Sequence, residues 1–193
     1  MEQLIRSIEN IISLSPKDRL VITDLFEKHI YTKGQHLLEI GNVCRYVFFI
    51  KTGLVRYYMI NDGEERTNYF NKEDEFVCNY RSFLPKLASE IGIQALEDTV
   101  VYRINKDNID QLYKNVEHGE RFGRLAIEQV FVSAINQLSS FYTDSPEQRY
   151  RKFIANFADT VQRVPQYYIA SFIGVKPPSL SRIRKRLFQR PDD

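Results

Sequence analysis

The sequence predicts an α+β protein with an N-terminal antiparallel β jelly-roll barrel, a long central helix and a C-terminal helix-turn-helix domain. Short stretches rich in β-branched and aromatic residues recur between residues 36 and 104, which is typical of strands. A helical period without glycine or proline runs from 124 to 145, and two short helical stretches follow it. We expect domain boundaries at 1–115, 116–143 and 144–193.

Two helices are expected before the barrel, the first over the apolar positions between Leu4 and Ile12. Ser15 before Pro16 predicts the N-cap of a second helix that reaches about Lys28. The expected strands cover residues 36–40, 46–50, 54–60, 66–70, 75–77 and 99–104. Short strands at this spacing favour a sandwich or jelly-roll barrel. Asp62-Gly63 favours a tight hairpin, because glycine accepts a positive φ.

The central helix carries a regular apolar stripe. Ile127, Phe131, Ala134, Leu138 and Phe141 alternate steps of four and three residues, as in a coiled coil. Other apolar residues cover further faces, and a helix apolar on several sides must be buried on more than one of them. We therefore expect Ile127, Phe131, Ala134 and Leu138 at a homodimer interface. The alternative is the central helix of a monomeric bundle, but too few other helices are expected to surround it.

Positive charge is concentrated near the carboxyl end. Residues 1–160 hold 20 Lys or Arg and 23 Asp or Glu, a net charge of −3, whereas residues 161–190 hold seven basic residues and no acidic one. A basic segment on a slightly acidic body is typical of a module that binds nucleic-acid phosphates. A solvated basic tail is the alternative reading of charge alone.

The same segment has the local signals of a helix-turn-helix. Ser145 and Gln148 can form a capping box around Pro146, which starts the preceding helix. Within residues 164–187, Gly174 is suited to ending the first helix of the motif and Pro177 to starting the second.

The second helix of the motif has distinct inner and outer faces. Leu180, Ile183 and Leu187 recur at helical spacing and should face inward. The outward face carries guanidinium, ammonium and hydroxyl groups of the kind that contact base edges and phosphates, with no acidic residue in the segment to pair its cations. An ordinary amphipathic helix with a solvated basic face is the alternative. The candidate DNA-binding residues are Gln166, Lys176, Pro178, Ser179, Ser181, Arg182, Lys185 and Arg186.

The order of these parts over about residues 20–188 resembles the Crp-Fnr family of bacterial regulators. Gly41 and Gly53 stand at family-like turns, residues 94–98 lead into the last strand, and Arg182 matches the arginine of the recognition helix. The resemblance implies a transcription regulator that binds a pseudo-palindromic site in promoter DNA as a homodimer, and that contacts RNA polymerase if it activates. Pro177 and Pro178 replace polar base-reading residues, so the family's target sequence cannot be carried over.

The resemblance also raises the question of an effector. Family members that bind cyclic nucleotides use a Gly-Glu pair for the ribose and an arginine for the phosphate, and residues 76–91 contain neither element in place. Glu90 stands about where the arginine is expected. We expect no control by cyclic AMP and an unknown effector or none, with a cyclic-nucleotide-responsive regulator as the alternative. The candidate effector-pocket residues are Asn79, Tyr80, Arg81, Ser89 and Glu90.

Other classes of protein are disfavoured. The sequence has no apolar run of about 20 residues and no export signal, so we expect a cytoplasmic protein without a membrane partner. Cys44 and Cys78 should be free thiols, too few for an iron-sulfur cluster. A cupin-type metal enzyme needs converging histidines, but His29 and His36 are seven residues apart and none lies in 37–117. We expect no enzyme activity, metal or cofactor, and a haem held by a histidine is unsupported.

Overall fold

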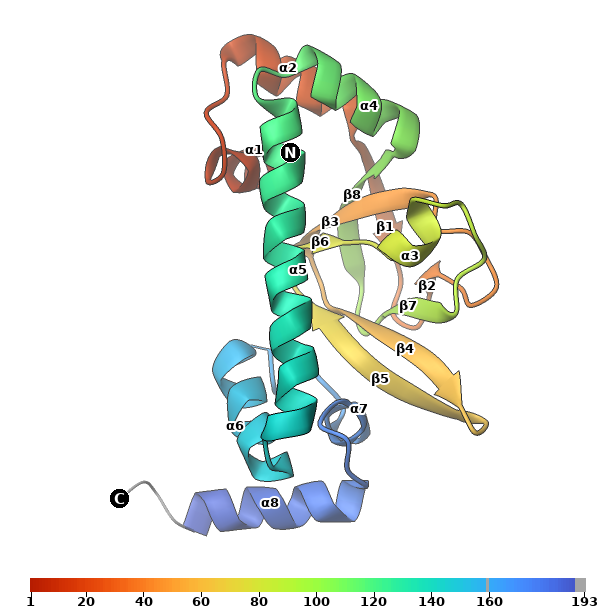
Figure 1. Ribbon diagram of the computed structural model, residues 1–193, viewed down its shortest axis with the longest axis vertical. Coiled ribbons are helices and arrows are strands. Elements are labelled where there is room, and N and C mark those ends of the chain that lie inside the picture. The colour runs from red at the N-terminus through yellow and green to blue at the C-terminus, as the bar shows by residue number, and fades with distance from the viewer. Residues whose placement is uncertain (159, 190–193) are drawn as a thin grey trace. The chain divides into compact units, whose positions relative to one another are not determined.

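The computed structural model describes residues 1–158 and 160–189, with side chains up to residue 187 (Figure 1). The last four residues of the predicted domain 144–193, and residue 159 within it, lie outside the described residues. The chain forms two compact units. One comprises residues 1–57 and 70–133, and the other comprises residues 58–69 and 134–193.

The first two helices are shorter than predicted. α1 (Glu2–Glu9) buries Leu4 and Ile8, and α2 (Pro16–Leu25) begins at a capping box in which Ser15 and Asp18 exchange hydrogen bonds. The expectation that this second helix reaches about Lys28 is wrong, because β1 (Glu27–Tyr31) begins two residues after it ends. All residues of β1 pair with β8, and pairing between segments so far apart in the chain cannot be recognised from the local sequence.

The predicted antiparallel barrel is confirmed as two four-stranded sheets, ordered β1-β8-β3-β6 and β2-β7-β4-β5. Fully buried side chains such as Phe49, Ile50 and Ile93 fill its core. The remaining strands are β2 (His36–Leu38), β3 (Tyr46–Thr52), β4 (Val55–Asn61), β5 (Glu64–Asn71), β6 (Phe76–Val77), β7 (Ile91–Ala95) and β8 (Thr99–Asn105).

The hairpin between β4 and β5 turns at the predicted dipeptide. Asp62 has φ +52° and Gly63 has φ +76°, and two consecutive positive φ values are the requirement of a type I′ turn.

In the second unit, the backbone N–H of Thr67 on β5 donates a hydrogen bond of 2.9 Å to the hydroxyl of Ser171.

Besides β1, three elements were missed in the sequence. β7 is short and interrupted by Gly92, and it qualifies as a strand through its pairing with β2. α3 (Tyr80–Phe83) is a single turn, whereas α4 (Lys106–Asn115) is a regular helix capped by the side chain of Asn105, which accepts the amide hydrogen of Asn108. That asparagine is an N-cap signal that could have been recognised.

The helical part of the chain follows its local signals. α5 (Gly119–Thr143) is the predicted long helix, with 25 residues. α6 (Pro146–Asn156) starts at the predicted capping box of Ser145 and Gln148. α7 (Gln166–Phe172) and α8 (Pro177–Gln189) form the helix-turn-helix, and Gly174 between them has φ +75°.

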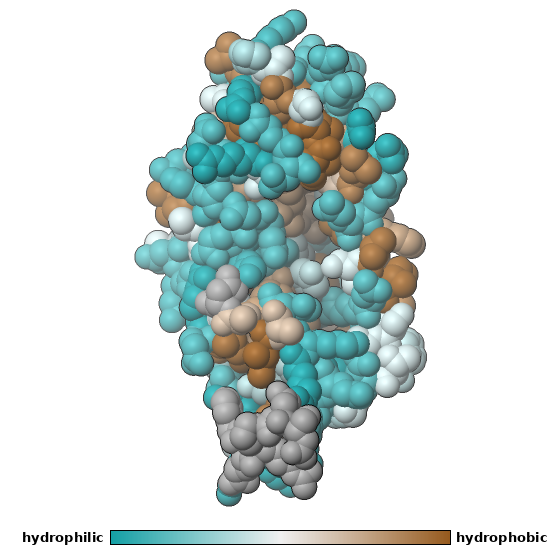
Figure 2. All heavy atoms as spheres, turned by 90° about the vertical axis from the view of Figure 1, so that its left-hand side faces the viewer, coloured by the Kyte–Doolittle hydropathy of each residue, from teal (hydrophilic) through white to brown (hydrophobic). Residues whose placement is uncertain are grey.

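The surface is mixed in character. On the face drawn in Figure 2, hydrophilic residues predominate and hydrophobic residues gather in smaller areas between them. Within the described part of the chain, no helix combines the length and apolarity that crossing a membrane requires.

Candidate nucleic-acid interface

α8 presents one buried and one exposed face in the second unit. Leu180 and Ile183 are buried, at 1% and 4% exposed, against a core that includes Ile169, Ala170 and Ile173 of the preceding helix and turn. The left-handed Gly174 lets the chain reverse between the two helices, and the Val175 amide then donates to the carbonyl of Ala170 at 2.9 Å. The packing thus fixes which side chains of α8 face outward.

Seven of the eight residues predicted to contact DNA are exposed: Gln166, Lys176, Pro178, Ser181, Arg182, Lys185 and Arg186. The eighth, Ser179, is half-buried. The guanidinium Nη2 of Arg182 donates to the hydroxyl of Ser179 at 3.2 Å, within one turn of the helix. This contact leaves the charge of Arg182 without an acidic partner among the ion pairs of the described residues.

Arg186 differs from the expectation that the cations of this face are uncompensated. Its Nη2 lies 3.3 Å from the Oε2 of Glu147, which is contributed by α6. The two residues are 39 positions apart, so the pair was not visible in the composition of residues 161–190. The expectation is therefore wrong for Arg186, and α8 presents a less positive surface than the sequence suggests.

Gln166 also has an unexpected partner. The Nη1 of Arg184 donates to its Oε1 at 2.7 Å, which links the start of α7 to α8. Arg184 is half-buried and was not among the predicted contacts, although its place beside Ile183 at the edge of the apolar stripe is a usable signal. Burial raises the pKa of the Tyr150 phenol, and the neighbouring Arg184 opposes that shift by charge and hydrogen bonding.

A small cavity of about 170 Å³ lies beside this pair. Its lining is mostly apolar, and the Nε of Arg184 has no hydrogen-bond acceptor among the described residues. The lining residues are Tyr150, Ile154, Val161, Gln162, Gln166 and Arg184.

The predicted dimer stripe of α5 is exposed in the single chain. Ile127 is 41% exposed, Phe131 65% and Leu138 53%, and Ala134 is exposed with them. Further large apolar side chains of the helix are also open to solvent, namely Val130, Val132, Ile135, Phe141 and Tyr142. A row of large apolar side chains on one exposed helix is typical of a surface that another molecule covers.

Four of the five candidate effector residues are engaged with one another. The buried Asn79 donates from Nδ2 to the Oγ of the buried Ser89 at 2.7 Å. Arg81 and Glu90 are 85% and 79% exposed and form an ion pair at 3.4 Å. Tyr80 is half-buried, and burial is the main cause that raises the pKa of its phenol. None of the five lines the cavity beside Arg184.

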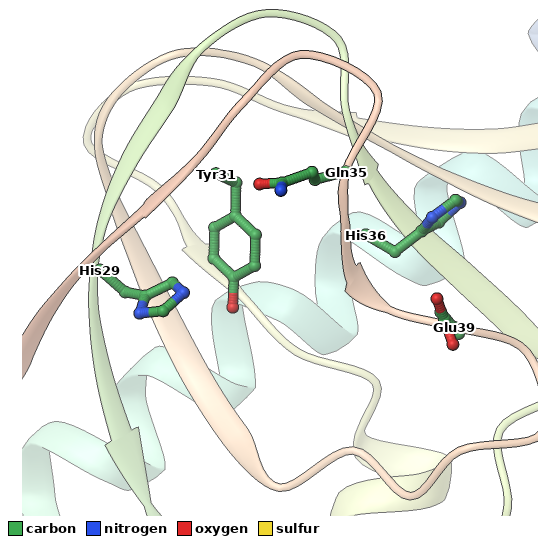
Figure 3. Close-up of a pocket in the computed structure, with 5 residues that line it drawn as sticks. All are labelled: His29, Tyr31, Gln35, His36 and Glu39. Atoms are coloured by element: carbon green, nitrogen blue, oxygen red, sulfur yellow. The ribbon is translucent and has the colours of Figure 1, made fainter.

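A second, more open cavity of about 430 Å³ lies in the first unit, on β1 and the chain around β2. Figure 3 shows His29 beside Tyr31, whereas His36 lies nearer to Glu39 on the other side. The ring centroids of His29 and Tyr31 are 4.7 Å apart. No three His, Cys, Asp or Glu side chains of the described residues come together as a metal site.

Comparison with known proteins places these observations in a family of folds. Residues 28–116 match the family of the cyclic nucleotide-binding domain. FixK2 from Bradyrhizobium japonicum superposes with a TM-score of 0.74 at 14% identity, over 85% of each chain. A protein from Eubacterium rectale that is assigned to the crp/fnr family of transcriptional regulators superposes with a TM-score of 0.69 at 17% identity, over 91% of this chain and 84% of the other.

The chain has the fold of the Crp-Fnr regulators. The superpositions cover most of both chains. The c-di-GMP responsive global regulator CLP from Xanthomonas campestris superposes with a TM-score of 0.69 at 13% identity, over 91% of this chain and 92% of the other. No curated protein sequence matches the chain.

Proposed function

We propose that the protein is a transcription regulator of the Crp-Fnr type that binds a pseudo-palindromic site in promoter DNA as a homodimer. The observation that carries the proposal is the outward face of α8, where Arg182 and Lys185 are exposed on a helix whose opposite face is held in the domain core. In this fold class, such a helix enters the major groove. Arg182 would contact base edges or phosphates, and Lys176 and Lys185 would contact phosphates.

The homodimer is supported by the exposed stripe of α5. Ile127, Phe131, Ala134 and Leu138 follow the spacing of a coiled coil and are all open to solvent in the single chain. A two-fold partner would cover each stripe with an identical one. It would also present two copies of α8 to DNA half-sites that are about 34 Å apart.

The effector is a separate question. The exposed Arg81 is already paired with Glu90, and the buried Asn79 with Ser89, so neither pair offers an open cradle for a cyclic phosphate. We infer that cyclic AMP does not control this protein and that it is not an enzyme. It would act in the cytoplasm and contact RNA polymerase if it activates.

Selection of duplexes from a random pool, followed by fluorescence anisotropy, tests DNA binding. We expect one enriched pseudo-palindrome, with affinity that falls steeply as salt rises. Arg182→Ala with Lys185→Ala should weaken binding at least tenfold and flatten the salt dependence. Arg121→Ala with Arg124→Ala removes the same charge from α5 and should leave binding nearly unchanged. Equal losses in both double variants, or no enrichment, would refute the proposal.

A cyclic-nucleotide-responsive regulator is the second candidate, and the match of residues 28–116 to the cyclic nucleotide-binding domain favours it. Isothermal titration calorimetry with cyclic AMP and cyclic GMP separates the two. We expect no heat of binding, and a micromolar dissociation constant for either nucleotide would establish the second candidate.

A further inference from the structure

The two cysteines of the chain meet at one point of the first unit. The Sγ atoms of Cys44 and Cys78 are 4.0 Å apart, although 33 residues separate them in sequence. Pairing of β3 with β6 brings them together, since Phe48 opposes Val77 in that ladder and each cysteine lies just beyond its strand. Both are free thiols. Neither the DNA-binding surface nor the dimer stripe involves this thiol pair.

The two sulfurs have different environments. Cys44 is 2% exposed, and its amide donates to the hydroxyl of Ser82 at 2.8 Å. Cys78 is half-buried, and its amide donates to the phenol oxygen of Tyr57 at 3.1 Å.

The pKa values of the two thiols are shifted in opposite directions. The hydrogen bond from Cys78, and a smaller one from the Asn79 amide, lower the pKa of the Cys44 thiol to about 7. Burial, and then Cys44 itself, raise the pKa of Cys78. The phenols of Tyr57 and Tyr80 also face the pair. The two thiols therefore titrate as a coupled pair in which the thiolate is favoured on Cys44.

We propose that Cys44 and Cys78 are an oxidation site, in which one of the two cysteines reacts with a small-molecule disulfide and the other then closes an intramolecular disulfide. In the first step the thiolate of one cysteine attacks one sulfur of the reagent. A bond forms between them, the reagent's own S–S bond breaks, and one thiolate leaves and takes up a proton.

In the second step the thiolate of the other cysteine attacks the protein sulfur of this mixed disulfide. The Cys44–Cys78 bond forms, the mixed disulfide breaks, and the second reagent thiolate leaves and is protonated. Two protein thiols are oxidised by two electrons and one small disulfide is reduced to two thiols. The sulfurs must approach from 4.0 Å to about 2.05 Å. This movement is small, because both cysteines lie in connections outside the regular strands.

Oxidised glutathione and the full-length protein test the site. After incubation, alkylation of the remaining thiols and digestion with trypsin without reductant, we expect one species in which peptide 34–45 is linked to peptide 73–81. The protein should lose two hydrogens in intact mass and recover both thiols with dithiothreitol. Persistence of two free thiols, or a link between cysteines of different chains, would overturn the proposal.

Single variants isolate the closing step. Cys44→Ser and Cys78→Ser should each accumulate the mixed disulfide with glutathione, because the second thiol is absent, whereas the wild type should go on to the intramolecular disulfide. A wild type that accumulates the mixed disulfide as readily as the single variants would contradict the proposal. The wild-type peptide map decides the proposal even if a variant fails to fold.

Discussion

The Nε of Arg149 on α6 donates a hydrogen bond of 2.9 Å to the carbonyl oxygen of Ile173, the residue that ends α7. Its Nη1 donates to the carbonyl of Asp144 at 2.6 Å, and its guanidinium lies 5.4 Å from the centre of the Phe141 ring. One side chain therefore ties the end of α5 and the start of α6 to the turn of the helix-turn-helix. These contacts lie at Gly174, where the chain reverses toward α8.

Arg149→Met should destabilise this arrangement while preserving side-chain volume. It leaves two carbonyls without their charged donor, and we expect the free energy of unfolding to fall by about 1–3 kcal/mol. Thermal and urea denaturation measure the loss. Arg121→Met, on the exposed surface of α5, is the control and should change stability by less than about 0.5 kcal/mol. Equal effects of the two substitutions would show that Arg149 does not organise the turn.

The helix-turn-helix was predictable because its determinants are local. The capping box of Ser145 and Gln148, the left-handed Gly174 and the apolar spacing of Leu180 and Ile183 each act within a few residues. The same holds for the hairpin at residues 62–63. Local signals of this kind can be recognised in a single sequence.

The pairs that modify the candidate site were not predictable. Glu147 reaches Arg186 from another helix, and the partnership of Gln166 with Arg184 depends on how α7 and α8 pack. The first residues of β1 were assigned to the preceding helix, because the identity of this strand comes from pairing with β8, about 70 residues away. Such contacts follow from tertiary packing, which overrides local propensity.

Glu147→Gln should strengthen DNA binding, if the proposed function holds. The substitution removes a carboxylate from the side of α8 and releases Arg186 for a phosphate. We expect affinity to rise about two- to fivefold at low salt, and the salt dependence to steepen by about one released counterion. Glu128→Gln breaks a comparable exposed ion pair with Arg124 on α5 and serves as the control. If anisotropy titrations show the same gain in DNA affinity for both variants, the affinity depends only on the net charge of the protein and not on the release of Arg186.

Gly53→Ala should be strongly destabilising. Gly53 has φ +113°, and an added Cβ would lie 2.7 Å from the Cα of Thr99 and 2.8 Å from its Cβ. Left-handed strain costs about 1–2 kcal/mol and overpacking about 1–3 kcal/mol more. Gly34→Ala is the matched control, since it has a positive φ but open space around it. Chemical denaturation should therefore show a clearly larger decrease in the free energy of unfolding for Gly53→Ala than for Gly34→Ala. Comparable decreases in the two variants would contradict the steric argument.

Phe131→Glu should convert the proposed homodimer to a monomer. Phe131 is 65% exposed in the single chain, and a carboxylate there would face its two-fold copy in the dimer without a partner. Sedimentation equilibrium should give dimer for the wild type and monomer for the variant, with folding checked by circular dichroism. Gln129→Glu adds the same charge off the stripe and should remain dimeric. A wild type that is monomeric at high concentration would rule out this interface.

Asp18 should contribute stability that depends on pH. Burial raises the pKa of its carboxyl, but hydrogen bonds from the Ser15 hydroxyl and from the Glu117 and Ser15 amides outweigh burial, and the pKa lies below its ordinary value of 3.8. A carboxyl with a lowered pKa in the folded state stabilises the fold above its ordinary pKa. That contribution is lost as pH falls through the folded value.

Asp18→Asn should therefore lower the free energy of unfolding at pH 7, by about 1–3 kcal/mol. The difference between the variant and the wild type should shrink as pH falls below 3.8, because protonation removes the same charge from the wild type. Urea denaturation between pH 7 and pH 3 measures both effects. Asp24→Asn, at an exposed position of the same helix, should show neither. A difference for Asp18→Asn that stays constant across this range would mean that the hydrogen bonds of Asp18 stabilise the fold equally well when it is protonated.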